Sequence, residues 1–132
     1  MSQENVELVR QVLDHWNNTG ELPWELLDPD YEYVIDPPAW LAGTYRGRAE
    51  VSDLIRRVAE VFDEFRFEGD DLVPVGDRVV SLGGIRVRGA LSGAGAVQTG
   101  GAGVHELRNG RIVRTRIYFD REQALRDAGL RE

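Results

Sequence analysis

The stretch from Gly103 to Asp120 constrains the fold of this chain more than any other. Both halves are rich in Val, Ile, Thr, Tyr and Phe, which favour strands, and Asn109-Gly110 lies between them. This pair tolerates the positive φ angles of a two-residue type I′ turn. The stretch therefore predicts a β-hairpin, and we expect it to form the centre of a curved antiparallel sheet.

A two-residue turn also determines which residues pair across the hairpin. Leu107 would face Ile112, and His105 would face Arg114. Because side chains alternate between the two faces of a strand, one face is then almost continuously apolar. We expect other elements to cover this face and a pocket to form there. Its members would be Ala102, Val104, Glu106, Val113, Thr115, Ile117 and Phe119.

The length and charge of the chain limit its possible functions. Its 132 residues predict a single domain over residues 1–132. The 23 acidic and 16 basic side chains give a net charge of −7, which repels phosphate backbones and anionic membranes. Neither nucleic acid nor a membrane is therefore expected as a partner.

The cysteine and histidine counts bear on metals and on location. The chain has no cysteine, so we expect neither a disulfide nor a thiolate metal site, and we expect a reducing, cytoplasmic location. His15 and His105 are the only histidines, which disfavours a histidine-rich metal centre. No run approaches the roughly 20 apolar residues that a membrane-spanning helix needs.

Hydrophobic periodicity divides the chain into a helical half and a strand-rich half. Helices are expected at 3–17, after Pro23 and around 51–62, with a strand at 31–36 and an aromatic loop at 37–47. Strands are expected at 65–75, 78–91, 96–108 and 111–119, and a short C-terminal helix at 121–130. This order predicts an α+β fold, a cone-shaped barrel in which a strongly curved antiparallel sheet wraps around three N-terminal helices. The mouth of such a cone forms a pocket.

Several short motifs resemble those of one known group. They are Tyr45-Arg46-Gly47-Arg48 at the start of the third helix, Asn109-Gly110-Arg111-Ile112 in the hairpin, and the Tyr-Phe-Asp ending of the last strand. These motifs resemble the SnoaL-like polyketide cyclase group of the nuclear-transport-factor-2-like superfamily, which also includes ketosteroid isomerases and limonene epoxide hydrolases. The resemblance covers essentially the whole chain, and the tail at 121–130 is similar to the ending common in actinobacterial members.

Asp36 is the main catalytic candidate. The resemblance places it where ketosteroid isomerases have their general-base aspartate, at the end of the first strand. An apolar pocket would favour the protonated carboxyl group and so suit it to removing a proton from a carbon next to a carbonyl. The alternative is that Asp36 hydrogen-bonds the backbone of the turn that Pro37 opens.

The oxyanion-stabilising residues of ketosteroid isomerases have no counterpart in this chain. The resemblance places one of them, a Tyr, at Leu13. It places the other, an Asp, among Gly100, Ala102 and Gly103, which have no side-chain donor. The water-activating Asp of the epoxide hydrolases corresponds to Ile117. Neither of these two activities is therefore expected.

Aromatic and apolar residues are the candidates for binding a hydrophobic ligand. Each could instead belong to the core, and for Trp16 the core is the favoured interpretation. Thr115 adds a hydrogen-bonding group to the expected pocket face. The candidates are Trp16, Tyr33, Trp40, Tyr45, Phe62, Val104, Thr115, Ile117 and Phe119.

His105 is a second catalytic candidate, because histidine can change its charge near neutral pH. In the simple register it lies opposite Arg114 and away from the apolar face, where a cationic neighbour disfavours its charged form. A bulge in the glycine-rich strand before it could turn it inward. The sequence leaves both positions open.

Two functions follow from these observations. The first is a cofactor-free isomerase, cyclase or lyase of the SnoaL-like type, which acts on a small hydrophobic carbonyl compound with Asp36 as proton acceptor. The alternative is a non-catalytic ligand-binding or dimeric scaffold domain, which the missing oxyanion donors favour. Arg86, Arg88, Arg114 and Arg116 are expected on the convex face of the sheet, through which the resemblance implies a homodimer.

Overall fold

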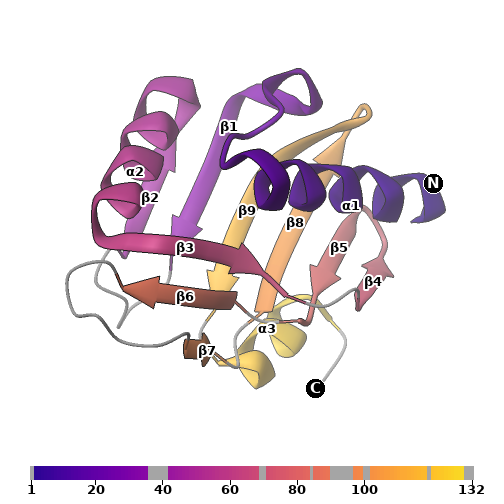
Figure 1. Cartoon of the computed structure of the whole chain (residues 1–132). Coiled ribbons are helices and arrows are strands. Elements are labelled where there is room, and N and C mark those ends of the chain that lie inside the picture. The colour runs from indigo at the N-terminus through magenta and orange to yellow at the C-terminus, as the bar shows by residue number, and fades with distance from the viewer. Residues whose placement is uncertain are drawn as a thin grey trace.

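The computed structural model describes residues 2–35, 42–68, 71–83, 85–89, 97–99, 102–118 and 120–129. Three of the expected site residues, Asp36, Trp40 and Phe119, lie outside these ranges. Figure 1 shows a large sheet with two helices, α1 and α2, packed against one of its faces. We call the face that α1 and α2 cover the inner face, and the opposite one the outer face.

The apolar periodicity of the first half forms the expected helices. Their bounds are Ser2–Thr19 for α1, Trp24–Leu26 for the short 3-10 helix η1, Gly47–Val61 for α2 and Arg121–Asp127 for α3. Gly20 follows α1 with a φ of 74°, a left-handed conformation that glycine adopts at little cost. Asp120 caps α3, because its side chain accepts a hydrogen bond from the backbone N–H of Glu122. The three N-terminal helices and the short C-terminal one are confirmed.

The described strands form two sheets. The larger has the order β2-β1-β9-β8-β5-β4, with β2 and β4 at its open edges, and the smaller has the order β3-β6-β7. The strands are β1 (Leu27–Ile35), β2 (Gly43–Arg46), β3 (Phe62–Phe67), β4 (Leu72–Val75), β5 (Arg78–Ser81), β6 (Ile85–Gly89), β7 (Val97–Thr99), β8 (Ala102–Arg108) and β9 (Arg111–Tyr118). The α+β fold, with helices against a curved sheet, is confirmed.

Several strand bounds differ from the expected ones. β1 begins at Leu27 rather than at 31 and runs parallel to β9, so the large sheet is mixed and not wholly antiparallel. Gly43–Arg46 falls in the expected aromatic loop but pairs with β1. The expected strands 65–75, 78–91 and 96–108 each divide between the two sheets. In the sequence, glycines stand between the two parts of each expected strand: Gly69, Gly83-Gly84 and Gly100-Gly101. Glycine within a strand pattern indicates a bulge or a bend, but it does not show that the next residues join a second sheet.

Apolar side chains on the inner face form the main core. Val79 of β5 and Ile112 of β9 are fully buried there, in one cluster with Val9 of α1 and Val51 of α2. A second cluster joins α3 to the outer face and consists of Val80, Ala102, Val104, Tyr118, Ala124 and Ala128. The two faces of the sheet are therefore covered by different helices.

The predicted hairpin is present as β8 and β9, but it contains a bulge. Leu107 pairs with Ile112, as expected for a two-residue turn. The next pair joins Glu106 to Arg114, which leaves Val113 without a partner across the two strands. All pairs farther from the turn are displaced by one residue, and such a displacement exchanges the side chains that share a face.

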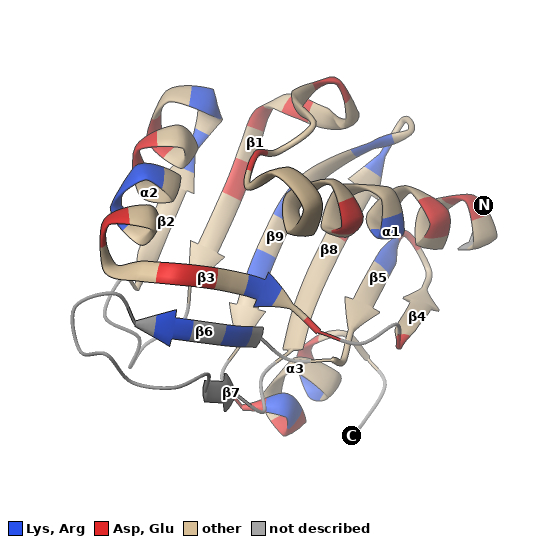
Figure 2. Cartoon of the chain, in the orientation of Figure 1, with Lys and Arg blue, Asp and Glu red and all other residues tan. Residues whose placement is uncertain are grey.

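The small sheet brings acidic and basic residues together. Glu64 of β3 pairs with Arg88 of β6, and Arg86 forms an ion pair with Glu68 at 2.8 Å between nitrogen and oxygen. Figure 2 shows acidic residues of β3 in red beside the basic residues of β6 in blue. Arg86 and Arg88 belong to this sheet, so the expectation that they lie on the same sheet face as Arg114 is wrong.

Candidate functional site

The bulge at Val113 puts Thr115 and Ile117 on the inner face, which His105 shares with Leu107. His105 pairs with Thr115 of β9 and with Val79 of β5, and both are buried. The expectation that His105 lies opposite Arg114, away from the core, is therefore wrong. The alternative expectation, that His105 points inward, is the one the structure has. The bulge lies in β9, however, and not in the glycine-rich strand that precedes His105.

His105 is 2% exposed and contacts two hydroxyl groups. Its Nδ1 atom lies 3.0 Å from Oγ1 of Thr115, and its Nε2 atom lies 3.2 Å from Oγ of Ser81. Burial lowers the pKa of His105 to about 4, so the imidazole is neutral at pH 7. A neutral imidazole has one donor and one acceptor nitrogen, so one of the two hydroxyls donates to the ring and the other accepts from it.

The absence of a side chain at Gly103 leaves room for Ser81 beside His105. A Cβ atom at Gly103 would lie 2.7 Å from Oγ of Ser81 and 3.3 Å from Nε2 of His105. The Ser81 hydroxyl also lies 3.4 Å from the carbonyl oxygen of Gly103, which is long for a hydrogen bond between two oxygens. Ser81 is half-buried, whereas its partner His105 is buried.

Two tyrosines of β1 lie next to these groups. Burial and the neighbouring Tyr33 raise the pKa of Tyr31, and a hydrogen bond with Thr115 partly offsets this rise. Burial also raises the pKa of Tyr33, which pairs with Thr115 across β1 and β9. Both phenols therefore keep their protons at neutral pH. We call the connected residues Ser81, His105, Thr115 and Tyr31 the polar chain.

The polar chain can orient protons without holding a net charge. Each hydroxyl and the neutral imidazole can donate one hydrogen bond and accept another, so the direction of one bond determines the direction of the next. A chain of this kind can present a hydrogen-bond donor at its end to an oxygen atom of a ligand.

The hairpin residues expected to form the pocket wall lie on both faces. Thr115 belongs to the polar chain, and Ile117 lies beside it on the inner face, where its Cδ1 atom is 3.5 Å from the position of a Cβ at Gly103. Val104 packs on the outer face in the cluster with Ala124. The expectation that Val104 faces the pocket is therefore wrong. Val104 alternates with His105 along β8, and the bulge in β9 separates it from Thr115 and Ile117, with which it was expected to share a face.

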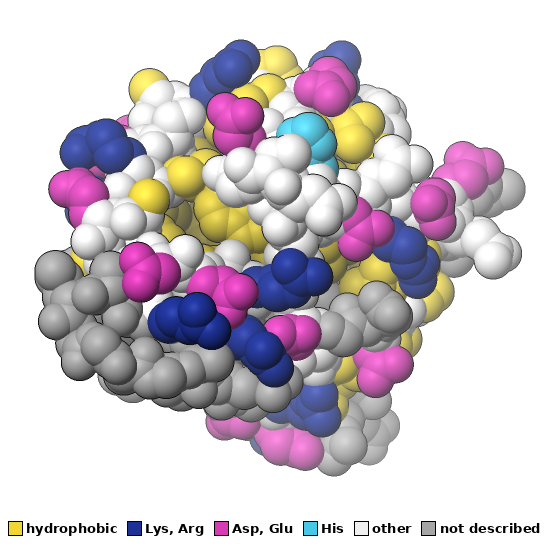
Figure 3. Space-filling model, in the orientation of Figure 1, with side chains coloured by type: hydrophobic (Ala, Val, Ile, Leu, Met, Phe, Trp, Pro, Cys, Tyr) yellow, Lys and Arg dark blue, Asp and Glu magenta, His cyan; other side chains and the backbone are white. Residues whose placement is uncertain are grey.

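Trp16 and Phe62 line a separate hollow of about 250 Å³ between the end of α1, the second half of α2 and β3. Figure 3 shows hydrophobic side chains gathered in this hollow. Nε1 of Trp16 donates a hydrogen bond of 3.0 Å to the carbonyl oxygen of Phe65, and the two rings pack edge to face. Trp16 thereby connects α1 to β3 through a hydrogen bond and an aromatic contact.

Tyr33 and Tyr45 pair across β1 and β2 and pack against the inner core. The guanidinium of Arg57 on α2 lies 5.6 Å from the centre of the Tyr45 ring, within range of a cation–π interaction. Both tyrosines therefore lie beneath α2, and Tyr33 is the one that adjoins the polar chain at Thr115.

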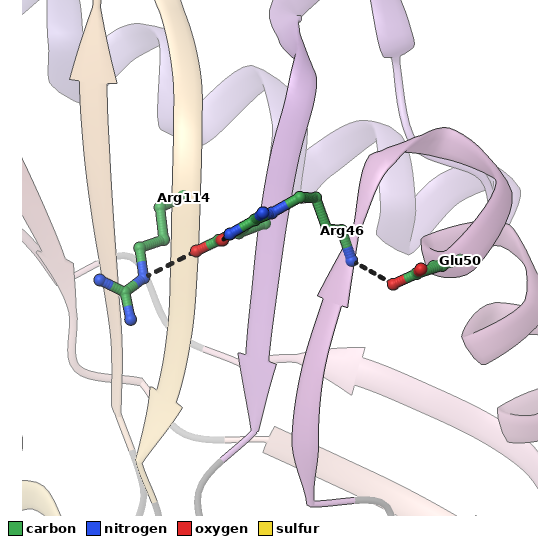
Figure 4. A network of polar contacts seen from close by, with 4 residues as sticks. Arg46, Glu50 and Arg114 are labelled. Atoms are coloured by element: carbon green, nitrogen blue, oxygen red, sulfur yellow. Dashed lines mark hydrogen bonds and ion pairs between the residues drawn. The ribbon is translucent and has the colours of Figure 1, made fainter.

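Ion pairs surround Glu32 on the outer face. The Glu32 carboxylate pairs with Arg46 of β2 and, at 3.5 Å, with Arg114 of β9. The backbone N–H of Arg46 donates a hydrogen bond of 2.8 Å to Glu50 at the start of α2. Figure 4 shows Arg46 and Arg114 reaching toward the carboxylate between them. The expected outer position of Arg114 is confirmed.

The described residues contain no group of three or more His, Asp or Glu side chains that could hold a metal ion. No helix in the described part of the chain is long and apolar enough to cross a membrane.

Sequence reasoning missed Ser81 and Tyr31. Both lie in or at the start of predicted strands, but their role depends on which strands adjoin. Ser81 reaches His105 only because β5 pairs with β8, and Tyr31 reaches Thr115 only because β1 pairs with β9. Neither pairing leaves a local signal in the sequence.

A family model and several solved structures resemble this chain over most of its length. The model of the SnoaL-like domain matches residues 9–115. An NTF2-like protein of unknown function from Burkholderia pseudomallei is 28% identical, with a TM-score of 0.77 over 93% of this chain and 95% of that chain. A search of the curated proteins found no match.

Two other solved structures are less similar in sequence. TerC, co-crystallized with polyporic acid, is 21% identical, with a TM-score of 0.76 over 95% of this chain and 97% of that chain. An LEH-like epoxide hydrolase from M. tuberculosis is 22% identical, with a TM-score of 0.72 over 90% of this chain and 84% of that chain. At these identities, the likeness shows a common fold alone.

Proposed function

Because the chain belongs to the SnoaL-like domain family, we propose that it binds a small hydrophobic carbonyl compound and moves a proton on it without a cofactor. The observation that supports this most is the polar chain within the apolar inner face. An apolar surface with a few convergent polar groups is typical of a small-molecule site. The reaction class would be that of an isomerase, cyclase or lyase.

Asp36 is the proposed proton acceptor. It follows Ile35 directly in the sequence, and Ile35 pairs with Ile117 of β9. Ile117 lies near the position of a Cβ at Gly103, next to Ser81. The chain therefore leaves β1 close to the end of the polar chain, so a carboxylate and hydrogen-bonding groups could act on one ligand. The residue-level resemblance to ketosteroid isomerases also supports this role.

The ligand would lie between the polar chain and the β1 end, with Tyr33, Thr115 and Ile117 as the described contacts. Trp40, Tyr45 and Phe119 remain proposed contacts from the sequence. The similarity to TerC, which was co-crystallized with polyporic acid, supports a small organic ligand for this fold. Trp16 and Phe62 would contact a ligand only through the hollow beside β3.

Proton exchange on β-tetralone, a hydrophobic ketone with acidic protons next to its carbonyl, tests this proposal. In deuterium oxide the base takes a proton from carbon, the C–H electron pair moves toward the carbonyl to form an enolate, and a deuteron returns to the carbon. NMR measures the loss of the proton signal. We expect the protein to accelerate exchange and Asp36→Asn to abolish the acceleration.

Asp30→Asn is the matched control, because Asp30 is an exposed carboxylate of β1, the strand that Asp36 follows in the sequence. The Asp30→Asn variant should accelerate proton exchange on β-tetralone as much as the wild type does. Acceleration that is equal in Asp36→Asn and in the wild type contradicts the assignment of Asp36.

A non-catalytic ligand-binding or scaffold domain is the second candidate. Two sets of contacts favour it, because they occupy groups that could otherwise act on a ligand. The Trp16 indole N–H donates its hydrogen bond to the carbonyl oxygen of Phe65, and both nitrogens of His105 already have hydroxyl partners. Binding of β-tetralone without accelerated exchange would support this candidate over the enzyme.

A homodimer through the outer face is also proposed. α3 covers only part of this face, and β1, β2 and β9 leave Glu32, Arg46, Val113 and Arg114 around a shallow hollow. Opposite charges next to an apolar side chain suit a self-complementary contact between two copies.

A further inference from the structure

We propose that the hollow beside β3, which Trp16 and Phe62 line, binds a small organic cation, an ammonium ion that carries methyl groups. This site is separate from the one proposed for the carbonyl compound, so each proposal can fail without the other. Aromatic rings, the ends of two helices and acidic side chains all favour a positively charged ligand in this hollow.

Three aromatic rings line the hollow, those of Trp16, Phe62 and Phe65. Phe65 lies at 87° to Trp16 and at 56° to Phe62, with the ring centres 6.2 Å apart in both pairs. Because neither pair stacks face to face, ring faces remain for other contacts. The face of an aromatic ring attracts a cation, and the face of a Trp does so most strongly.

The arginines of the chain leave these rings free. In the described part of the chain, guanidinium groups lie over the rings of Trp24, Tyr45 and Tyr118. No described arginine lies over the three rings of the hollow. The chain itself therefore supplies no cation to them, and a ligand can do so.

Two helices end at the hollow. Trp16 and Asn17 belong to the last turn of α1, Val58 and Ala59 belong to the last turn of α2, and all four line the hollow. The C-terminal end of a helix carries a partial negative charge. Neither helix has a basic side chain in its last turn to offset this charge. Both helix ends therefore favour a cation in the hollow.

The charged side chains of the lining leave a net negative charge. They are the carboxylates of Asp63 and Glu64 and the guanidinium of Arg66. Glu64 stands opposite Arg88 of β6. Asp63 is exposed and forms no ion pair with a described residue, so its carboxylate is available to a ligand. Figure 3 shows acidic side chains, in magenta, along the border of the hollow.

The size and the apolar wall of the hollow define the kind of cation. Its volume of about 250 Å³ is below the roughly 300–1,000 Å³ that sites for drug-sized ligands have. The side chains of Ile55 and Val58 complete the wall beside the rings. A methylated ammonium ion presents its methyl groups to this wall and its positive charge to the ring faces and to Asp63.

Two probes of the same shape test the proposal, namely choline and the uncharged alcohol in which carbon replaces the nitrogen of choline. In NMR titrations of isoleucine-labelled protein, choline should shift the methyl signal of Ile55, which lines the hollow, and not that of Ile117. The neutral alcohol should bind at least about fivefold more weakly, because it lacks the cation–π attraction. Equal affinity for the two probes, a shift of Ile117 without one of Ile55, or no binding of choline would overturn the proposal.

Charge variants test the electrostatic part of the site. Asp63→Asn should weaken choline binding by about twofold to fivefold, as expected for an exposed ion pair. Arg66→Gln should strengthen it by a similar factor, because this change removes the positive charge from the lining. Both residues are exposed, so both variants should fold.

Asp30→Asn is the matched control for Asp63→Asn. It changes the net charge of the protein by the same amount, but Asp30 lies at the hollow of the outer face. Choline should bind to Asp30→Asn as it binds to the wild type. Equal weakening by Asp30→Asn and Asp63→Asn would show a general charge effect and would overturn the proposal.

Phe62→Leu tests the aromatic part, since Leu keeps an apolar side chain and removes the ring. It should weaken choline binding by about twofold to fivefold and leave binding of the neutral alcohol unchanged. Equal weakening for both probes would mean that the ring offers only apolar contact, which would overturn the selection of a cation by the rings. If Phe62→Leu does not fold, the two charge variants and the two probes still decide the proposal.

Discussion

His105 is neutral because it is buried on the inner face, where its contacts are hydroxyl groups and not charged side chains. Ser81 and Thr115 contact its two nitrogens, and the nearby Tyr31 and Tyr33 keep their protons at neutral pH. A proton added to this ring would place a charge in the core without an ionised partner among the described residues that contact it. The histidine can direct hydrogen bonds at neutral pH but does not act as a charged group there.

We expect the protein to lose stability as the pH falls from 6.5 toward 4. His105 takes up its proton near pH 6.5 when unfolded and near pH 4 when folded. Between these values the unfolded state binds more protons, so acid favours unfolding. The full effect of this shift is about 3 kcal/mol. Urea unfolding at several pH values in this window measures it.

Exposed His15 is the matched control for this pH dependence. His15→Gln should unfold with the same pH dependence as the wild type, whereas His105→Gln should show a flatter one. A pH dependence in His105→Gln as steep as that of the wild type contradicts a buried neutral His105.

Gly103→Ala should lower the free energy of unfolding by about 1–3 kcal/mol. The new Cβ would lie 2.7 Å from the Ser81 oxygen, so the serine must move. The same substitution should cost less in a Ser81→Ala background, where this oxygen is absent. Urea unfolding of the wild type, Gly103→Ala, Ser81→Ala and the double variant measures the cost of Gly103→Ala in both backgrounds. Equal costs would show that the Gly103 Cβ position and the Ser81 oxygen do not compete for space.

The hairpin shows how far an element can be predicted from its residues. Asn109-Gly110 predicted the turn, and both residues have the required positive φ angles of 54° and 75°. The bulge was not predicted, because an extra residue in β9 leaves the strand composition unchanged. The sequence contains one hint: Ile112 and Thr115, both buried on the inner face, are three positions apart instead of two.

Deleting Val113 should leave a folded protein, because the residues on either side already pair in consecutive positions with Leu107 and Glu106. We expect a loss of no more than about 2 kcal/mol in the free energy of unfolding. Deleting Arg116 instead would put Thr115 and Ile117 on opposite faces and should prevent folding. Circular dichroism and urea unfolding distinguish the two. If the Val113 deletion lowers the free energy of unfolding as much as the Arg116 deletion does, the pairing of β8 with β9 described above is contradicted.

At the scale of the whole molecule, the fold followed from periodicity and the site did not. Helical and strand-like patterns predicted the three leading helices and the strand-rich second half. They could not show that three predicted strands cross between sheets, or that β5 lies beside β8 and brings Ser81 to His105. Strand order depends on contacts between residues far apart in the sequence, which local patterns do not encode.

The proposed dimer makes a prediction at this scale. Val113 lies among the charged residues of the outer-face hollow, so Val113→Glu would place an unpaired charge in the contact between two copies. Sedimentation should show a dimer for the wild type and at least a tenfold weaker one for Val113→Glu, about 1.4 kcal/mol. A monomeric wild type, or a dimer unaffected by the substitution, argues against this face.

The central claim is that the ligand lies on the inner face at the Ser81 end of the polar chain. Methyl NMR with isotope-labelled isoleucine and unlabelled β-tetralone tests it most directly, because Ile117 lines the proposed site and Ile55 lines the separate hollow near Trp16. We predict nuclear Overhauser contacts between the β-tetralone protons and the Ile117 methyl. Contacts to Ile55 with none to Ile117 would contradict the account.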